Sequence, residues 1–183
     1  MIQYCSSCLI PTTRPDQKLN EDMVCNACLS FRKKAEIDWD SRRIELENIL
    51  NNYKNINSSE WNCIVPVSGG KDSTIQVLKM LELGMKPLCV TASTCHLSEV
   101  GRKNIENLKY LGVDLIEFSP DLKIRKQLNR IGLTTVGDIA WPEHVGIFTI
   151  PVNISVKFKI PLIIWGESSQ NEYGGPASAE DVA

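Results

Sequence analysis

Short apolar runs alternate with longer amphipathic stretches in the last two thirds of the chain. The apolar runs have the length of buried strands and lie at residues 61–67, 87–92, 113–118 and 162–165. Between them, apolar residues recur at intervals of three and four, which is typical of helices. These helices are expected at residues 73–83, 98–111 and 121–131. Strands separated by helices form right-handed crossovers, so the pattern predicts an α/β fold with a doubly wound parallel sheet.

The segment before the last apolar run carries two periods at once. Large apolar residues alternate strictly from Ile150 to Ile160, which by period alone indicates a strand. Phe148, Val152 and Val156, however, recur every four residues. A parallel sheet also requires a crossover before its next strand. We therefore predict a helix over residues 144–159.

Residues 30–55 are rich in charged side chains and carry one apolar stripe. Leu46, Ile49, Leu50 and Tyr53 fall on one helical face, while glutamates and arginines occupy the other. Asparagines and serines up to residue 59 then indicate a loop. Residues 1–30 hold two Cys-x-x-Cys pairs, an arrangement typical of a zinc ribbon. We therefore predict a ribbon at residues 1–30, a linking helix and loop at 31–59, and the main domain at 60–183.

Composition narrows the class of protein. The 183 residues include 20 Lys and Arg against 22 Asp and Glu, a formal net charge of −2. Proteins that grip long nucleic acids are usually basic, so this balance argues against a nucleic acid partner. No apolar run reaches the length of a membrane span, and the first residues do not begin a signal peptide. Together with seven cysteines, four of them in Cys-x-x-Cys pairs, this favours a soluble cytoplasmic protein.

The two Cys-x-x-Cys pairs form a candidate metal site. Cys5 and Cys8 are separated from Cys25 and Cys28 by 16 residues, and two thiolate pairs on short turns can supply a tetrahedral zinc site. The segment between the pairs has few large apolar residues and could hardly fold without a metal. Because four thiolates leave zinc no open position, we predict a structural ion. An iron–sulfur cluster would use the same ligands.

The first apolar run of the main domain ends in a glycine-rich turn, Ser68-Gly69-Gly70-Lys71-Asp72-Ser73, directly before a helical pattern. In such a strand–loop–helix unit, backbone N–H groups and a helix N-terminus meet an anion. Glycines let the backbone approach a phosphate, and serine hydroxyls and a lysine can bind it. The spacing excludes a Walker A loop, which needs G-x-x-x-x-G-K-[ST]. The plain alternative is a tight turn with Asp72 or Ser73 as the helix cap.

Three further segments fall at the carboxyl ends of the expected strands, where doubly wound sheets bind their ligands. They are residues 91–96, the turn at 119–120, and the polar, glycine-rich residues 166–175. The last segment contains Glu167 and Glu172, whose carboxylates suit Mg²⁺ but are also common as solvated loop groups.

The string from Ser68 to Ser73 resembles the pyrophosphate loop of the PP-loop ATP pyrophosphatases. In that family a substrate oxygen attacks the α-phosphate of ATP, and pyrophosphate leaves. Further motifs extend the similarity along nearly the whole chain: the Cys₄ segment, Ile37-Asp38-Trp39, Glu99-Val100-Gly101-Arg102-Lys103-Asn104, Ile164-Trp165-Gly166-Glu167 and Glu172-Tyr173-Gly174-Gly175. Together they resemble the N-acetyl sugar amidotransferases of surface-polysaccharide and nonulosonic-acid (pseudaminic or legionaminic type) biosynthesis.

This resemblance implies an enzyme that converts the acetamido group of a nucleotide-activated sugar to an acetamidino group. ATP would adenylate the amide oxygen, and ammonia would displace AMP. By motif position, the pyrophosphate would be bound by Ser68, Gly69, Gly70, Lys71, Asp72 and Ser73. Thr91 and Ala92 would lie near the adenine, and Gly166 and Glu167 would face the α-phosphate or Mg²⁺. The catalytic candidates are Lys71, Asp72 and Glu167.

The resemblance also implies a separate glutaminase subunit that supplies ammonia. Glutamine hydrolysis needs an activated nucleophile, usually a cysteine with a histidine base. Cys95, beside His96, is the only cysteine outside the Cys₄ segment and the expected strands. Adjacent residues of an extended segment point their side chains apart, so we expect no glutaminase within this chain.

Two features depart from the family pattern. Ala140 stands where the pattern often carries a cysteine near Trp-Pro, which leaves His144 without a thiol neighbour in that motif. Family members also continue further beyond the last motif, so we expect a chain ending at Ala183 to be C-terminally truncated. Two alternatives stay open: a tRNA-thiolating PP-loop enzyme with Cys95 as its nucleophile, and a nucleotide-binding or zinc module without catalysis.

Overall fold

The computed structural model describes residues 2–14, 17–54, 60–93 and 97–166. They fall into two compact units, one formed by the residues up to Ile44 and the other by Glu45–Gly166. Helix α2, Trp39–Lys54, begins in the first unit and ends in the second. Each unit has a core of its own.

The first unit is built around its cysteines. Two antiparallel bridges fold the chain back on itself, and helix α1, Asn26–Lys33, follows. The buried core consists of Cys5, Val24 and Cys25, with five partly buried apolar neighbours around it. So few apolar side chains provide little stability by themselves.

The prediction of a single helix over residues 30–55 is wrong. Helix α1 ends at Lys33, a 3₁₀ turn (η1) covers Lys34–Glu36, and α2 starts at Trp39. Ile37 between them is extended, with φ −73° and ψ 127°. The Asp38 carboxylate then accepts the N–H of Ser41 at 3.0 Å, as a capping aspartate does. Because such a bond starts a new helix and competes with continuing the old one, the break falls here.

A parallel sheet forms the middle of the second unit. Its strands, in the order β1-β2-β3, are Cys63–Pro66, Pro87–Ala92 and Asp114–Phe118. The expected fourth strand is a single parallel bridge from Ile163 to Ile64, on the side of β1 away from β2. The chain therefore winds outward from β1 to β3 and then returns to the opposite side of β1. The direction of winding reverses at β1.

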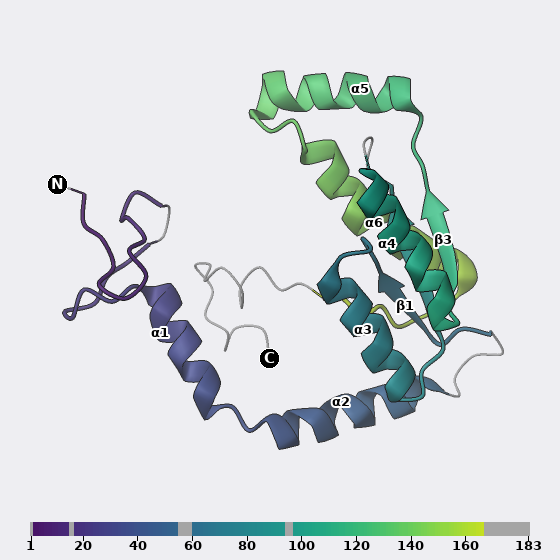
Figure 1. Cartoon of the computed structure of the whole chain (residues 1–183), viewed down its shortest axis with the longest axis horizontal. Coiled ribbons are helices and arrows are strands. Elements are labelled where there is room, and N and C mark those ends of the chain that lie inside the picture. The colour runs from purple at the N-terminus through teal and green to yellow at the C-terminus, as the bar shows by residue number, and fades with distance from the viewer. Residues whose placement is uncertain (1, 15–16, 55–59, 94–96, 167–183) are drawn as a thin grey trace. The chain divides into compact units, whose positions relative to one another are not determined.

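Helices cover both faces of this sheet, which confirms the predicted fold class (Figure 1). Helices α3, Lys71–Glu82, and α4, Glu99–Leu108, lie over one face and contribute Val77 and Leu108 to its core. Helix α6, Trp141–Phe158, covers the other face, which confirms the helix expected at residues 144–159. The remaining elements are η2, Lys109–Leu111; α5, Leu122–Ile131; and the π-helical turn η3, Gly132–Val136.

Some large apolar side chains of these helices lie on the surface. On α3, Met80 is buried and Leu78 is exposed. On α5, the stripe of Ile124, Leu128 and Ile131 is exposed, whereas Arg125 is only 5% exposed.

The apolar residues of α6 that recur every four positions do not face the sheet. Phe148, Val152 and Val156 are exposed, and the helix packs on the sheet through Ile150 and Ile154. Among the described residues, no helix combines the length and the apolar character that crossing a bilayer requires.

Candidate functional site

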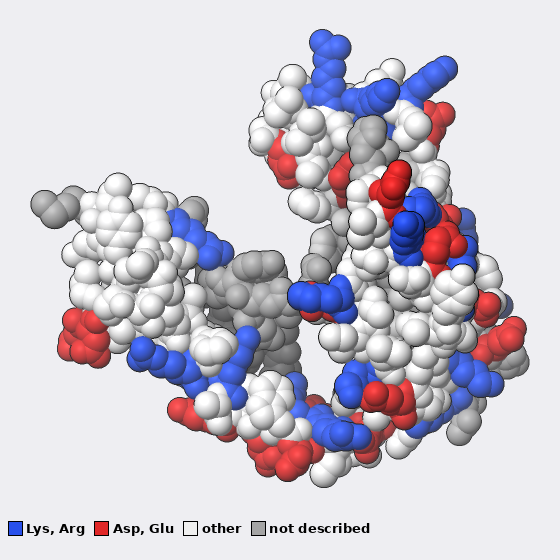
Figure 2. Space-filling view, viewed as in Figure 1, with Lys and Arg blue, Asp and Glu red and all other residues white. Residues whose placement is uncertain are grey.

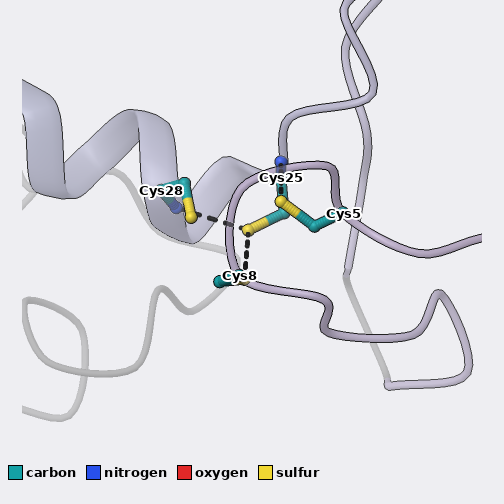
Figure 3. A group of neighbouring side chains, drawn as sticks. All are labelled: Cys5, Cys8, Cys25 and Cys28. Atoms are coloured by element: carbon teal, nitrogen blue, oxygen red, sulfur yellow. Dashed lines mark hydrogen bonds between the residues drawn. The ribbon is translucent and has the colours of Figure 1, made fainter.

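Four cysteines of the first unit gather around a common centre (Figure 3). The sulfurs of Cys5, Cys8, Cys25 and Cys28 all lie within 4.8 Å of one another, and Cys8 Sγ is 3.6 Å from Cys25 Sγ. Zinc–sulfur bonds of about 2.3 Å in a tetrahedron place the sulfurs about 3.8 Å apart. The arrangement fits one zinc ion held by the four predicted ligands.

Backbone N–H groups point at these sulfurs. Cys5 Sγ accepts the N–H of Ser7 at 3.3 Å and that of Cys25 at 3.2 Å, and Cys25 Sγ accepts the N–H of Cys28 at 3.3 Å. Burial raises the pKa of Cys5, but the backbone N–H groups together outweigh it and lower that pKa to about 6.

The Cys8 thiol responds differently. The N–H of Ile10 favours its thiolate, yet burial and the neighbouring cysteines together raise its pKa to about 12. Thiolates this close repel one another, and a divalent cation at their centre would remove the repulsion. The cluster is therefore suited to a cation that neutralises it.

The predicted phosphate-binding loop connects β1 to α3. Gly69 has φ +76°, a left-handed conformation that favours glycine. A Cβ on Gly69 would lie 2.9 Å from Ile105 Cγ1 of α4, so the loop is packed directly on that helix. Ser68 Oγ accepts the N–H of Gly70 at 3.3 Å, and Ser73 Oγ accepts the N–H of Ser68 at 3.4 Å. Both serine side chains brace the turn internally.

Helix α3 begins after Gly70 without a side-chain cap, so neither Asp72 nor Ser73 caps it. The N–H of Thr74 donates to the Gly70 carbonyl at 3.1 Å, so the three earlier N–H groups, at residues 71–73, have no helical acceptor. Lys71 Nζ lies 2.7 Å from both carboxylate oxygens of Asp72, and the two side chains are 82% and 72% exposed. N–H groups without a helical acceptor, a helix N-terminus and an exposed lysine are what a phosphate requires.

The loop lies where the winding of the sheet reverses, the usual ligand position in open α/β sheets. The N–H of Val67 donates to the Val90 carbonyl at 2.9 Å, which ties the start of the loop to β2. On the other side of β1, a Cβ on Gly166 would lie 2.9 Å from Gln76 Oε1 of α3. That oxygen is buried and accepts no hydrogen bond from any residue that the structure describes. The structure thus brings the loop and Gly166 together at the carboxyl end of β1.

Of the other predicted site residues, the structure describes Thr91 and Ala92 but not Glu167. Thr91 and Ala92 end β2 at the same edge, but Thr91 is only 3% exposed, so its side chain belongs to the core. Glu167, Cys95 and His96 lie outside the described residues, and their roles stay predictions.

The two strand cysteines are core residues, as expected. Cys63 and Cys89 are buried, and burial raises the pKa of each thiol to about 12. A thiol with so high a pKa is a poor nucleophile. His144 lies near the start of α6, where its Nδ1 is 3.9 Å from Asp138 Oδ2.

One ion pair at the carboxyl ends of the strands was not predicted from the sequence, although Arg102 belongs to a motif named there. Arg102 of α4 donates from Nη1 and Nη2 to Glu117 of β3 at 2.6 and 2.9 Å. Arg102 is the main cause that lowers the pKa of Glu117, and Ser93 also hydrogen-bonds that carboxylate. The signal in the sequence was a glutamate at the carboxyl end of an apolar strand.

No protein-family model matches this chain, and no curated protein matches it. Among solved structures, the chain is similar to the crystal structure of a predicted subunit of a tRNA methyltransferase from Methanocaldococcus jannaschii, with a TM-score of 0.42 and 18% sequence identity. The match covers 66% of this chain and 58% of that one.

Proposed function

We propose that this chain is an ATP-dependent amidotransferase of the PP-loop type that acts on the acetamido group of a nucleotide-activated sugar. The observation that carries the proposal is the loop at residues 68–73, which presents three helix-start N–H groups at the reversing edge of the sheet. The sequence of that loop and the later motifs resemble the N-acetyl sugar amidotransferases, and they supply the substrate class.

The surroundings of the loop suit the triphosphate of ATP. Its N–H groups at residues 71–73 and the exposed Lys71 ammonium complement phosphate oxygens. Asp72 is exposed and offers carboxylate oxygens, the ligands that Mg²⁺ prefers. When bound, Mg²⁺ would neutralise charge on the phosphates.

The reaction exchanges an oxygen for a nitrogen in two displacements. The amide oxygen attacks the α-phosphorus, the bond to pyrophosphate breaks, and an O-adenylated imidate forms. Ammonia then adds to the imidate carbon, and AMP leaves with the former amide oxygen. Activation is needed because an amide oxygen is a poor leaving group, whereas AMP is a good one. In this scheme Lys71 holds the leaving pyrophosphate, and the zinc site stabilises the first unit.

The test is product analysis with ATP, ammonium chloride and UDP-linked N-acetyl sugars. We expect AMP and pyrophosphate in amounts equal to the amidine formed. Lys71→Ala should lower turnover by about 10²–10³, the typical effect of removing one charge-stabilising contact. Lys79→Ala is the matched control, since Lys79 is also exposed on α3 and ion-paired, with Glu82 at 2.7 Å.

Each outcome points to one function. ADP and phosphate as products would contradict the adenylation chemistry. ATP binding without any release of AMP would instead support the nucleotide-binding module.

A further inference from the structure

A cavity of about 630 Å³ opens beside the carboxyl ends of β2 and β3, at the start of α4. This volume is within the range that small-molecule sites occupy, about 300–1,000 Å³. Six of its nine lining residues carry a hydroxyl or a charge, and the others are Leu97, Pro120 and Leu122. The cavity is therefore a polar pocket with a few apolar wall residues.

The charges in the pocket are balanced. Arg102 and Lys103 are its cations, while Glu99 lines it and Glu117 binds Arg102 from the strand below. Figure 2 shows basic and acidic side chains next to one another over α4. Because Glu117 occupies both Nη atoms of Arg102, that charge is already neutralised. A phosphate group binds more favourably where positive charge is in excess, so the balanced charges do not favour a phosphate in this pocket.

Several polar groups remain available to a ligand. Lys103 and Glu99 form no ion pair with any described residue, and Ser119 Oγ makes no hydrogen bond to one. Ser98 Oγ accepts the N–H of Gly101 at 3.1 Å, which leaves its hydroxyl proton free to donate. Donors and acceptors are thus mixed, which suits a ligand whose own groups are hydroxyls.

The pocket and the phosphate-binding loop share helix α4. A Cβ on Gly69 would lie 3.0 Å from Ile105 N and 3.2 Å from Asn104 C, so the loop touches α4 immediately after Lys103. Arg102 and Lys103, in the turn before that contact, line the pocket. A ligand in the pocket would therefore lie on the same helix as the phosphates bound at the loop.

We propose that this pocket holds the pyranose ring of the N-acetyl sugar, with its hydroxyls on Glu99, Lys103 and the serines and its C–H face on Leu122. The inference rests on the proposed function, because the sugar must lie beside the ATP site. It adds the sugar-binding residues, which are distinct from those of the loop.

The test uses one variant that fills the pocket without changing its polar residues and one that changes a polar residue. Leu122→Trp places a larger side chain at the wall, and Leu128→Trp on the same helix is the control, since Leu128 does not line the pocket. A second pair is Glu99→Gln in the pocket and Glu106→Gln further along α4. The probes are UDP-N-acetylglucosamine and UDP-N-acetylgalactosamine, measured by calorimetry and by saturation transfer to the acetyl methyl group, with ATP titrated separately.

We expect Leu122→Trp and Glu99→Gln to raise the Kd for the sugar nucleotide about tenfold or more, as the loss of a good contact does. Both controls should match the wild-type chain, and the Kd for ATP should change less than about twofold in all four variants. Unchanged sugar binding in both pocket variants would overturn the inference and leave the proposed function standing. A rise in the Kd for ATP alone would assign the pocket to the nucleotide. No binding of either probe by the wild-type chain, with ATP still bound, would overturn the proposed function itself.

Discussion

Replacing Gly69 with alanine should destabilise the second unit through two separable effects. The first is backbone strain, because a left-handed conformation at φ +76° costs an L-residue about 1 kcal/mol of folding free energy. The second is a steric conflict, because the new Cβ would lie 2.9 Å from Ile105 Cγ1 and 3.0 Å from Ile105 N. The side chain could turn away, but the backbone nitrogen belongs to α4 and cannot move alone.

Gly112 separates the two effects. Its φ is +78°, almost the same as that of Gly69, but a Cβ there would meet nothing within 4 Å. Gly112→Ala should therefore cost only the strain, about 1 kcal/mol. Gly69→Ala should cost that amount plus about 1–3 kcal/mol for overpacking. The difference between the two variants measures how tightly the loop is held on α4.

Urea unfolding at a fixed zinc concentration gives this difference. With a slope of about 2 kcal/mol/M, the midpoint of Gly69→Ala should fall about 0.5–1.5 M below that of Gly112→Ala. Hydrogen exchange of the β1 and β2 amides follows the second unit alone. Equal midpoints for the two variants would refute the close approach of the loop to α4, and with it the argument that both ligands share this helix.

Three further predictions concern metal, pH and nitrogen source. Protein purified without added metal should contain one zinc per chain, and Cys25→Ser with Cys28→Ser should abolish it; metal retained by that double variant would refute the site. The pKa of Glu117 is lowered by Arg102, so its contribution to stability is present above the ordinary value of 4.5 and is lost as pH falls through the lowered pKa. The stability difference between wild type and Glu117→Gln should therefore shrink below about pH 4.5 in low salt, whereas a constant difference would contradict the ion pair. Ammonium should support amidine formation by the chain alone and glutamine only with a separate glutaminase; glutamine-driven product that is lost on Cys95→Ala would place that activity in this chain.

The layered fold was predictable because strand-length apolar runs and amphipathic stretches alternate in sequence. The inner face of α6 was not predictable, and the reason is visible in its composition. Apolar residues occupy almost every second position around Ile150, so both sides of the helix are apolar and periodicity cannot choose between them. In the folded chain Ile150 and Ile154 pack on the sheet, and Val152 and Val156 lie on the surface.

Some features of the candidate sites could likewise be predicted from the sequence, and others could not. The Cys₄ cluster and the loop at residues 68–73 are local in sequence, so spacing and turn chemistry were enough to find them. Gln76 and Gly166 meet only because the sheet reverses at β1, and Arg102 meets Glu117 only because α4 lies over β3. Contacts of that kind depend on topology, and a single sequence contains no direct record of them.

The bridge between Ile64 and Ile163 also sets an order for folding. Strand β1 can pair with β2 as soon as the α3 crossover has been made, but its other edge waits for a residue 99 positions further along. During synthesis, that edge stays open while β2, β3, α5 and α6 emerge, and an open apolar edge can pair with another chain. Closing so long a loop is also entropically costly and slow. Among the pairings of this sheet, the one that brings Gly166 to Gln76 is therefore expected to form last, and a nascent chain would form the loop at residues 68–73 before the neighbouring side of β1 is covered.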